Sequence, residues 1–125
     1  MAATTQLTIP PTSLPVGTIG PLTTPTLPAN VAAYQLTTVP VVWPASGDVL
    51  QLIVEESPDN GATWLFSASN SLSSVNGGMG TDKLGNPITA DVWTFTPMFR
   101  GTTVKLRLTL RVLQACRISG SVVSL

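Results

Sequence analysis

Apolar and polar residues alternate most regularly between Thr103 and Leu113. From Val104 to Val112 every second side chain is aliphatic, and the positions between them are basic or threonine. Because successive side chains of a strand point to opposite faces of a sheet, this pattern predicts a half-buried β-strand. The expected faces are Val104, Leu106, Leu108, Leu110 and Val112 on the buried side, and Lys105, Arg107, Thr109 and Arg111 on the other.

Two apolar runs flank a cluster of turn-forming residues in the segment Val49–Phe66. The first run ends near Val54, the turn formers SPDNG occupy 57–61, and apolar residues resume at Trp64. Proline presets its own φ, Asp and Asn bond back to the backbone, and glycine accepts a positive φ. The segment therefore predicts a β-hairpin.

Further strand-like segments are Val31–Trp43, Asp91–Pro97 and Ile118–Leu125, whereas the Ser- and Gly-rich residues Ser67–Pro87 predict a long polar loop. No segment requires a helix. About six to eight short strands separated by turn signals predict an all-β fold, an antiparallel β-sandwich or jelly-roll-like domain. We assign residues 31–125 to this domain.

Residues 1–30 carry six prolines among many threonines. This spacing excludes a helix and disfavours central strands, because proline lacks an N–H and cannot donate to a ladder. We expect an extended Thr/Pro-rich N-terminal arm that lies along its own domain or along a neighbour. The side chains through which the arm would bind a partner are Leu7, Ile9, Leu14, Val16, Ile19, Leu22 and Leu27.

Charge is scarce in this chain of 125 residues: charged residues make up 10%, hydrophobic ones 43%, and the formal net charge is zero. A surface with so little charge has weak colloidal protection, so we expect other subunits to cover much of it, in a homo-oligomer. A single cysteine and no histidine exclude an internal disulfide and a Cys/His zinc site. No signal peptide or membrane-spanning run is visible, and we expect no membrane partner.

The basic face of the 103–113 strand, formed by Lys105, Arg107 and Arg111, has three readings. Glu55, Glu56 or Asp91 on a neighbouring strand would neutralise it, or an acidic patch on a partner would do so, or it would bind nucleic acid. Zero net charge disfavours nucleic acid, which we do not expect as a partner.

Catalytic chemistry has few candidate residues here. Without histidine there is no Ser-His or Cys-His pair, and Cys116 lies in a strand pattern. Glu55 and Glu56 are adjacent on a strand, so they point to opposite faces and cannot easily form a carboxylate pair. We therefore predict no enzyme, no cofactor and no metal site, because neither Asp59 nor Asp82 begins a calcium-loop pattern. Four aromatic residues remain candidates for a sugar-stacking platform: Tyr34, Trp43, Trp64 and Trp93.

The octapeptide Ser57–Trp64, SPDNGATW, resembles the Asp box of sialidase-like propellers, S-x-D-x-G-x-T-W. In that family the motif forms a hairpin turn, in which the Asp side chain hydrogen-bonds to the backbone of the turn and the Trp packs beneath the turn. The motif lies away from the active site of those enzymes. The resemblance implies a structural turn at Ser57, Asp59, Gly61 and Trp64. It implies no sialidase activity, because the motif occurs once in a chain too short for a propeller.

The wider segment Glu55–Trp64 resembles the E-x-S-x-D-x-G-x-T-W hairpin of accessory virion proteins of tailed bacteriophages. There a strand ending in Trp-Pro, here Trp43-Pro44, precedes the hairpin. The resemblance implies a non-enzymatic virion protein made in the host cytoplasm, a capsid decoration or cement protein that bridges major capsid subunits or binds other virion proteins. The alternatives are a receptor- or carbohydrate-binding module of a tail or fibre, and a ring protein that completes the neck or tail.

Overall fold

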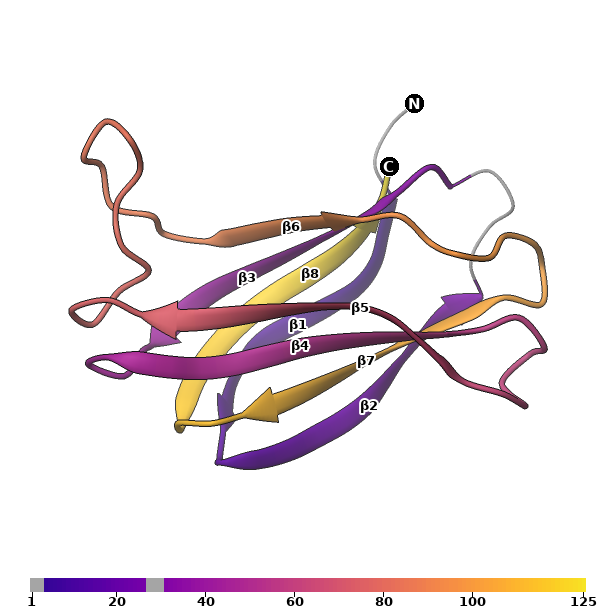
Figure 1. Ribbon diagram of the computed structural model, residues 1–125, viewed down its shortest axis with the longest axis horizontal. Coiled ribbons are helices and arrows are strands. Elements are labelled where there is room, and N and C mark those ends of the chain that lie inside the picture. Colours follow the sequence, from indigo (N-terminus) through magenta and orange to yellow (C-terminus); the bar gives the residue numbers. More distant parts are fainter. Residues whose placement is uncertain (1–3, 27–30) are drawn as a thin grey trace.

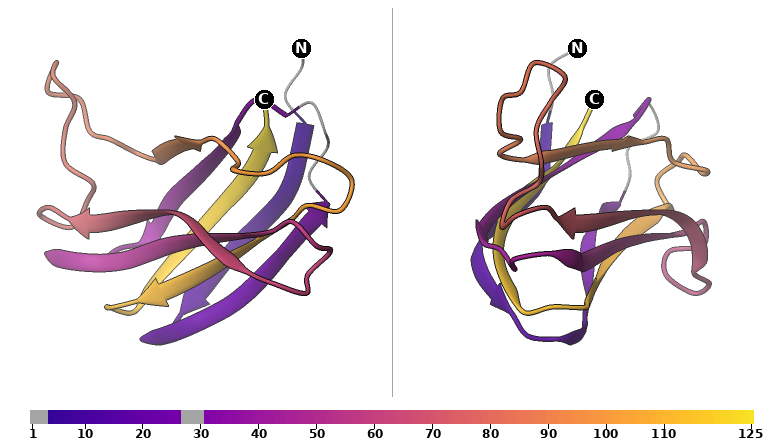
Figure 2. Two further views of the ribbon diagram at one scale, coloured as in Figure 1. Left: turned by 45° about the vertical axis from the view of Figure 1, so that its right-hand side comes forward. Right: turned by 60° about the vertical axis from the view of Figure 1, so that its left-hand side comes forward.

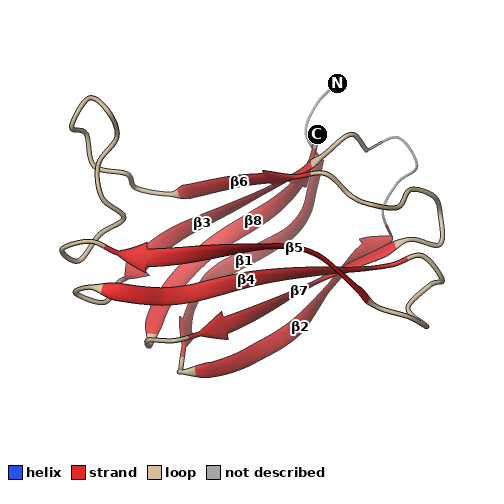
Figure 3. Ribbon diagram, in the orientation of Figure 1, coloured by secondary structure: helices blue, strands red, loops and turns tan. Residues whose placement is uncertain are grey.

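The protein, described here by a computed structural model over residues 4–26 and 31–125, consists of eight strands joined by turns and loops (Figure 3). Among these residues there is no helix, and none is therefore long and apolar enough to cross a membrane. The strands are β1 (Thr4–Leu14), β2 (Gly17–Thr26), β3 (Tyr34–Val42), β4 (Gly47–Ser57), β5 (Leu65–Ser74), β6 (Asp91–Phe95), β7 (Lys105–Val112) and β8 (Cys116–Ser124).

The strands form two four-stranded antiparallel sheets, in the orders β1-β8-β3-β6 and β2-β7-β4-β5 (Figure 1). The chain crosses between the sheets at almost every connection, and only the β4–β5 hairpin stays within one sheet. The two sheets lie face to face as separate layers (Figure 2). Eight strands paired in these orders form a jelly roll, which confirms the predicted all-β sandwich class.

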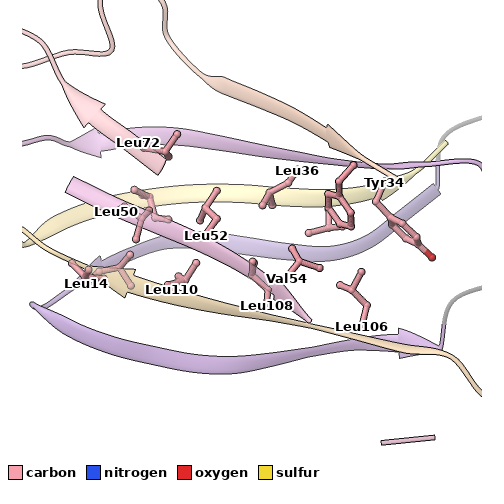
Figure 4. Close-up of a cluster of buried hydrophobic side chains, with 14 of the residues drawn as sticks. Leu14, Tyr34, Leu36, Leu50, Leu52, Val54, Leu72, Leu106, Leu108 and Leu110 are labelled. Carbon is pink, nitrogen blue, oxygen red and sulfur yellow. The ribbon is translucent and has the colours of Figure 1, made fainter. Parts of the chain in front are cut away.

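The hydrophobic core lies between the two sheets (Figure 4). The alternating segment supplies one row of it from β7, and β4 supplies the adjacent row of Leu50, Leu52 and Val54. As the alternation predicts, Val104, Leu106, Leu108, Leu110 and Val112 are all at most 2% exposed. The basic side chains between them therefore lie on the outer face of the β2-β7-β4-β5 sheet.

The expectation of a separate N-terminal arm is wrong for residues 4–26, which form the edge strands β1 and β2 of the same domain. Leu14 is buried in the core and Leu7, Ile9, Ile19 and Leu22 pack against it, so these side chains contact their own domain. Val16 lies 66% exposed at the β1–β2 turn, and Leu27 falls outside the described residues.

Prolines in β1 and β2 lie where the ladders are irregular, and this explains how so proline-rich a segment forms strands. The β1–β8 register shifts between Ile9 and Thr12, across two prolines, and the β2–β7 register shifts between Ile19 and Leu22 and between Thr23 and Thr26. Proline is tolerated at bulges and on edge strands because no donor is needed there. The proline count correctly disfavoured central strands, but the arm predicted from it is instead a pair of edge strands.

The predicted loop Ser67–Pro87 is also shorter than expected, because β5 continues to Ser74. Serines alternate with other residues along this half of β5, and a serine-rich strand carries little hydrophobic signal. The connection to β6 therefore begins at residue 75. Within it Asp82 Oδ1 accepts hydrogen bonds from the N–H groups of Asn86 (3.0 Å) and Leu84 (2.9 Å), which lower the pKa of Asp82.

Candidate functional site

The turn between β4 and β5 is held by its own side chains. The Ser57 hydroxyl donates to Asp59 Oδ1 (2.8 Å) and accepts from the Gly61 N–H (2.8 Å), and the Thr63 N–H donates to Asp59 Oδ1 (2.8 Å). The hydrogen bond from Ser57, followed by those from Thr63, lowers the pKa of Asp59. Asn60 and Gly61 both have a positive φ, of 60° and 95°. At position 61 glycine adopts this conformation without strain, because it has no Cβ.

The turn is also fixed to the β6–β7 connection. The Asn60 N–H donates to the Thr103 carbonyl (2.9 Å), and the Thr103 hydroxyl donates to the Pro58 carbonyl (2.9 Å). Lys105 passes beside the turn, since a Cβ added to Gly61 would lie 3.8 Å from Lys105 Cδ. The structure thus places Ser57, Asp59 and Gly61 together in one structural turn. The Asp59 carboxylate, although exposed, already accepts hydrogen bonds from within this turn.

Trp64 is half-buried on the outer face of the sheet, and its ring also lies against the turn, since a Cβ added to Gly61 would be 3.9 Å from Trp64 Cζ2. Its ring covers the guanidinium of Arg107, with Arg107 Cζ 4.3 Å from the ring centroid. Arg107 Nε also donates to Glu55 Oε1 at 3.0 Å. Among the three readings of the basic face, neutralisation by Glu55 on the adjacent strand is what the structure shows for Arg107. Arg111 is exposed, beside Gln51 on β4 and Thr18 on β2.

The neighbouring carboxylate, Glu56, is fully buried at the inner face of β4. It accepts hydrogen bonds from the N–H groups of Met98 (3.0 Å) and Phe99 (3.3 Å) and from the hydroxyl of Ser67. Glu56 therefore ties β4, β5 and the β6–β7 connection together. As expected from strand geometry, Glu55 and Glu56 face opposite sides of the sheet. Sequence reasoning did not assign Glu56 this role, because its donors come from a loop distant in sequence.

The four candidate aromatic residues do not share one face. Tyr34 is 1% exposed and stacks on Phe95 with ring centroids 5.8 Å apart; Trp93 lies 5.1 Å from the same ring. Trp43 is half-buried, and neither its Nε1 nor the Tyr34 hydroxyl has a hydrogen-bond partner among the described residues. Burial, and then the charge of Glu56, raises the pKa of Tyr34 to about 12. Trp64 covers Arg107 on the opposite sheet, so the four do not form a stacking platform.

The outer face of the β1-β8-β3-β6 sheet has a different character, and we call it the neutral face. Two rows of four residues cross it from strand to strand. The first row is Thr8, Ser121, Thr37 and Val92, and the second is Thr5, Val123, Gln35 and Thr94. Val39 and Ser119 extend the face, and Arg117, at its far end, is the one charged side chain on the described part of it. The sequence contained no signal for this surface, because its residues are far apart along the chain.

Two apolar hollows lie beside the edge strands. One of about 460 Å³ is open and is lined by Leu14, Pro15, Val42 and Cys116, with burial raising the pKa of the Cys116 thiol. The other, about 230 Å³, lies between β1 and β2 and is lined by Leu7, Ile9, Ile19 and Leu22 among others. In the described ranges no three His, Cys, Asp or Glu side chains gather as a metal site would require.

Comparison of the chain with family models, with curated proteins and with solved structures finds no match.

Proposed function

We propose that this chain is a non-enzymatic structural protein of a virus particle, a capsid decoration or cement protein that binds major capsid subunits through its neutral face. The observation that carries the proposal is the absence of charge across both rows of that face, from Thr8 to Val92 and from Thr5 to Thr94. The described charged side chains lie instead on the other sheet, in loops or in the interior, except for two in this sheet: Arg117 lies at the far end, and Asp91 at the start of β6 is half-buried and accepts a hydrogen bond from Asn70 of β5.

The energetic argument concerns what it costs to cover each face. Covering the outer face of the β2-β7-β4-β5 sheet would desolvate Arg111 and the Arg107–Glu55 pair, and uncompensated burial of charge is expensive. Covering the two rows of the neutral face, without Arg117 at its far end, removes from water only hydroxyls, one amide and β-branched side chains. Protein interfaces are likewise depleted of charge at their centres. The neutral face is therefore the side of the sandwich that a partner covers at the lower cost.

Fold and sequence resemblance support the same proposal by association. Eight-stranded jelly rolls are found in viral capsid proteins and also in lectins, so the architecture alone does not assign a function. The bacteriophage-like hairpin at Glu55–Trp64 favours the virion, and the separation of the four aromatic residues disfavours a sugar-stacking site. The small number of charged residues over the whole chain also fits a protein whose surface is largely covered by other subunits of an assembly.

The deciding experiment locates the chain in purified particles by quantitative mass spectrometry and cryo-electron microscopy. We expect hundreds of copies on the shell, with the neutral face against capsid subunits. Binding to undecorated shells is then compared for two variants. Thr8→Glu/Gln35→Glu charges the neutral face and should weaken binding at least about tenfold, since each charge must be desolvated. The control Thr18→Glu/Gln51→Glu, beside Arg111 on the other face, should bind as the wild type does.

Other locations would overturn the proposal in recognisable ways. A small ring of copies at the neck or tail would assign the chain to a completion protein. Particles without the chain, together with binding to a glycan that is lost on Trp43→Ala, would assign it to a carbohydrate-binding module. Equal weakening by both charged variants would remove the neutral face from the interaction.

A further inference from the structure

The four strands at the sheet edges differ in how well they are protected against pairing with another chain. An edge strand presents unpaired N–H and C=O groups, and proteins usually block it with proline, charge, bulges or short length. β1 contains Pro10 and Pro11 at a register shift, and β2 contains Pro21 and Pro25 at two more. β6 has only five residues and begins with Asp91. These three edges are blocked.

β5 has none of these protections over most of its length. Its ten residues, LFSASNSLSS, contain no proline, no glycine and no charged side chain. The β4–β5 ladder has two register shifts: one skips Val49 of β4, and only the other, near the start of β5, skips a residue of β5, between Phe66 and Ala68. From Ala68 to Ser74 the strand advances without interruption. An unblocked edge of this length is a template for a further strand.

The main chain of β5 has free hydrogen-bonding capacity on its outer side. Apart from the ladder with β4, no backbone–backbone hydrogen bond found within residues 4–26 and 31–125 involves β5. The connection that follows β5 leaves its end and rises toward β6 instead of running back along the strand (Figures 1 and 2). Asn70 Nδ2 donates to Asp91 Oδ2 (2.8 Å), a side-chain contact between β5 and β6. Met79 and Ile88 of the connection line a small hollow with Ser71, Leu72 and Ser73 at the end of β5, but among the described residues no backbone hydrogen bond from the connection closes this edge.

We propose that β5 pairs with β5 of a second copy of this chain, antiparallel, so that one sheet of eight strands runs through the dimer. The side chains fit this occupant. On the outer face of the regular half of β5 all three residues are exposed serines, Ser69, Ser71 and Ser73, so an in-phase register there sets serine against serine. Cross-strand hydroxyl pairs are favourable and no like charges meet.

The same comparison of edges explains why the association stops at two copies. After β5 has paired with its symmetry mate, the free edges of the extended sheet are the two copies of β2. Pro21, Pro25 and the register shifts of β2 block further addition. A twofold contact between identical edges is closed, so the product is a dimer and not a fibre. This proposal uses the other sheet from the neutral face and does not rest on the virion assignment.

The test uses the purified full-length chain without any capsid. Analytical ultracentrifugation should show a monomer–dimer equilibrium, and hydrogen exchange should show protection of the 68–74 amides that rises with protein concentration. A chain that stays monomeric at about 100 μM, a concentration at which specific dimers of micromolar Kd are formed, overturns the proposal. So does a dimer in which the 68–74 amides exchange as fast as in the monomer.

Charged variants give the sharper result. Ser69→Lys/Ser71→Lys and Ser69→Glu/Ser71→Glu should each weaken self-association by about tenfold or more, because like charges then face each other across the dimer edge. Mixing the two variants should restore a one-to-one dimer, which also shows that both fold. The control Thr89→Lys/Thr102→Lys places the same charge in exposed loops and should dimerise as the wild type does. If the lysine and glutamate variants each self-associate more weakly but do not form a dimer when they are mixed, strand pairing through β5 is contradicted.

Discussion

Arg107 on β7 lies directly opposite Glu55 on β4, with Arg107 Nε 3.0 Å from Glu55 Oε1, and the Trp64 ring covers the same guanidinium. The two charged side chains are each 26% exposed, which places the pair between a solvated surface bridge and a buried one. Trp64 belongs to the turn between β4 and β5. The contact therefore connects the turn to β7, one of the two central strands of its sheet.

We expect Arg107→Ala to lower the free energy of unfolding by about 1–2 kcal/mol, because it removes both the ion pair and the cation–π contact. A double-mutant cycle with Trp64→Ala should give a coupling energy of about 0.5–1 kcal/mol. Urea denaturation measures each value. The matched control is Arg111→Ala, which removes an exposed arginine and should change stability by less than about 0.5 kcal/mol. A coupling energy near zero would contradict the stacking.

Glu56 should be far more sensitive to substitution than its neighbour Glu55. Glu56→Ala leaves the N–H groups of Met98 and Phe99 without a buried acceptor and should destabilise the protein by about 3–5 kcal/mol. Glu56→Gln keeps one acceptor oxygen and should cost less. Glu55→Gln is the control, with an expected loss of about 1 kcal/mol or less. Equal losses at the two positions in thermal and urea denaturation would refute the assignment of Glu56 as the tie between β4 and the 98–99 backbone.

Tyr34 should make the protein sensitive to alkali. Its pKa is raised from 10.0 to about 12, so the folded state favours the protonated phenol. This contribution is complete below pH 10 and is lost as the pH rises from 10 to 12, by about 2–3 kcal/mol in total. Tyr34→Phe should remove this component of the pH dependence. Near neutral pH the variant should be as stable as the wild type or more so, because the hydroxyl has no hydrogen-bond partner.

Urea denaturation at about pH 8 and about pH 11 measures this difference for both proteins. Tyr34 is the single tyrosine of the chain, so the absorbance of tyrosinate reports its ionisation directly. A tyrosine that ionises at its ordinary pKa in the folded protein, or a variant that loses as much stability in alkali as the wild type, would count against the buried setting of Tyr34.

Gly120 on β8 lies against the backbone of β3 and should not accept a side chain. A Cβ at this position would lie 2.5 Å from the Thr37 carbonyl oxygen, which belongs to the ladder and cannot move away cheaply. Gly120→Ala should therefore destabilise the protein by about 3 kcal/mol or more. Gly78→Ala is the matched control, since its Cβ would meet nothing closer than 3.9 Å. Similar melting temperatures for the two variants would show that β3 and β8 lie further apart than described.

Several elements of the fold could be predicted from local pattern because the pattern repeats within a single strand. The alternation at 104–112 assigned every side chain of β7 to the correct face. The cluster SPDNG indicated the β4–β5 turn, since Ser57, Asp59 and Gly61 act within five residues of one another. The opposite orientation of Glu55 and Glu56 followed from strand geometry alone.

Other features depended on which strands the fold brings together. The proline content of residues 4–26 disfavoured central strands and led to the prediction of an arm. Pairing with β7 and β8 instead joins these residues to the core as edge strands, because shared burial of Leu14 and its neighbours outweighs a weak local propensity. The buried ties of Glu56, the neutral face and the open edge of β5 are relations between residues far apart in sequence. Side-chain alternation is a property of a single strand, so it could be predicted from the sequence alone. Strand order depends on how two whole sheets pack together, so it follows only from the tertiary structure.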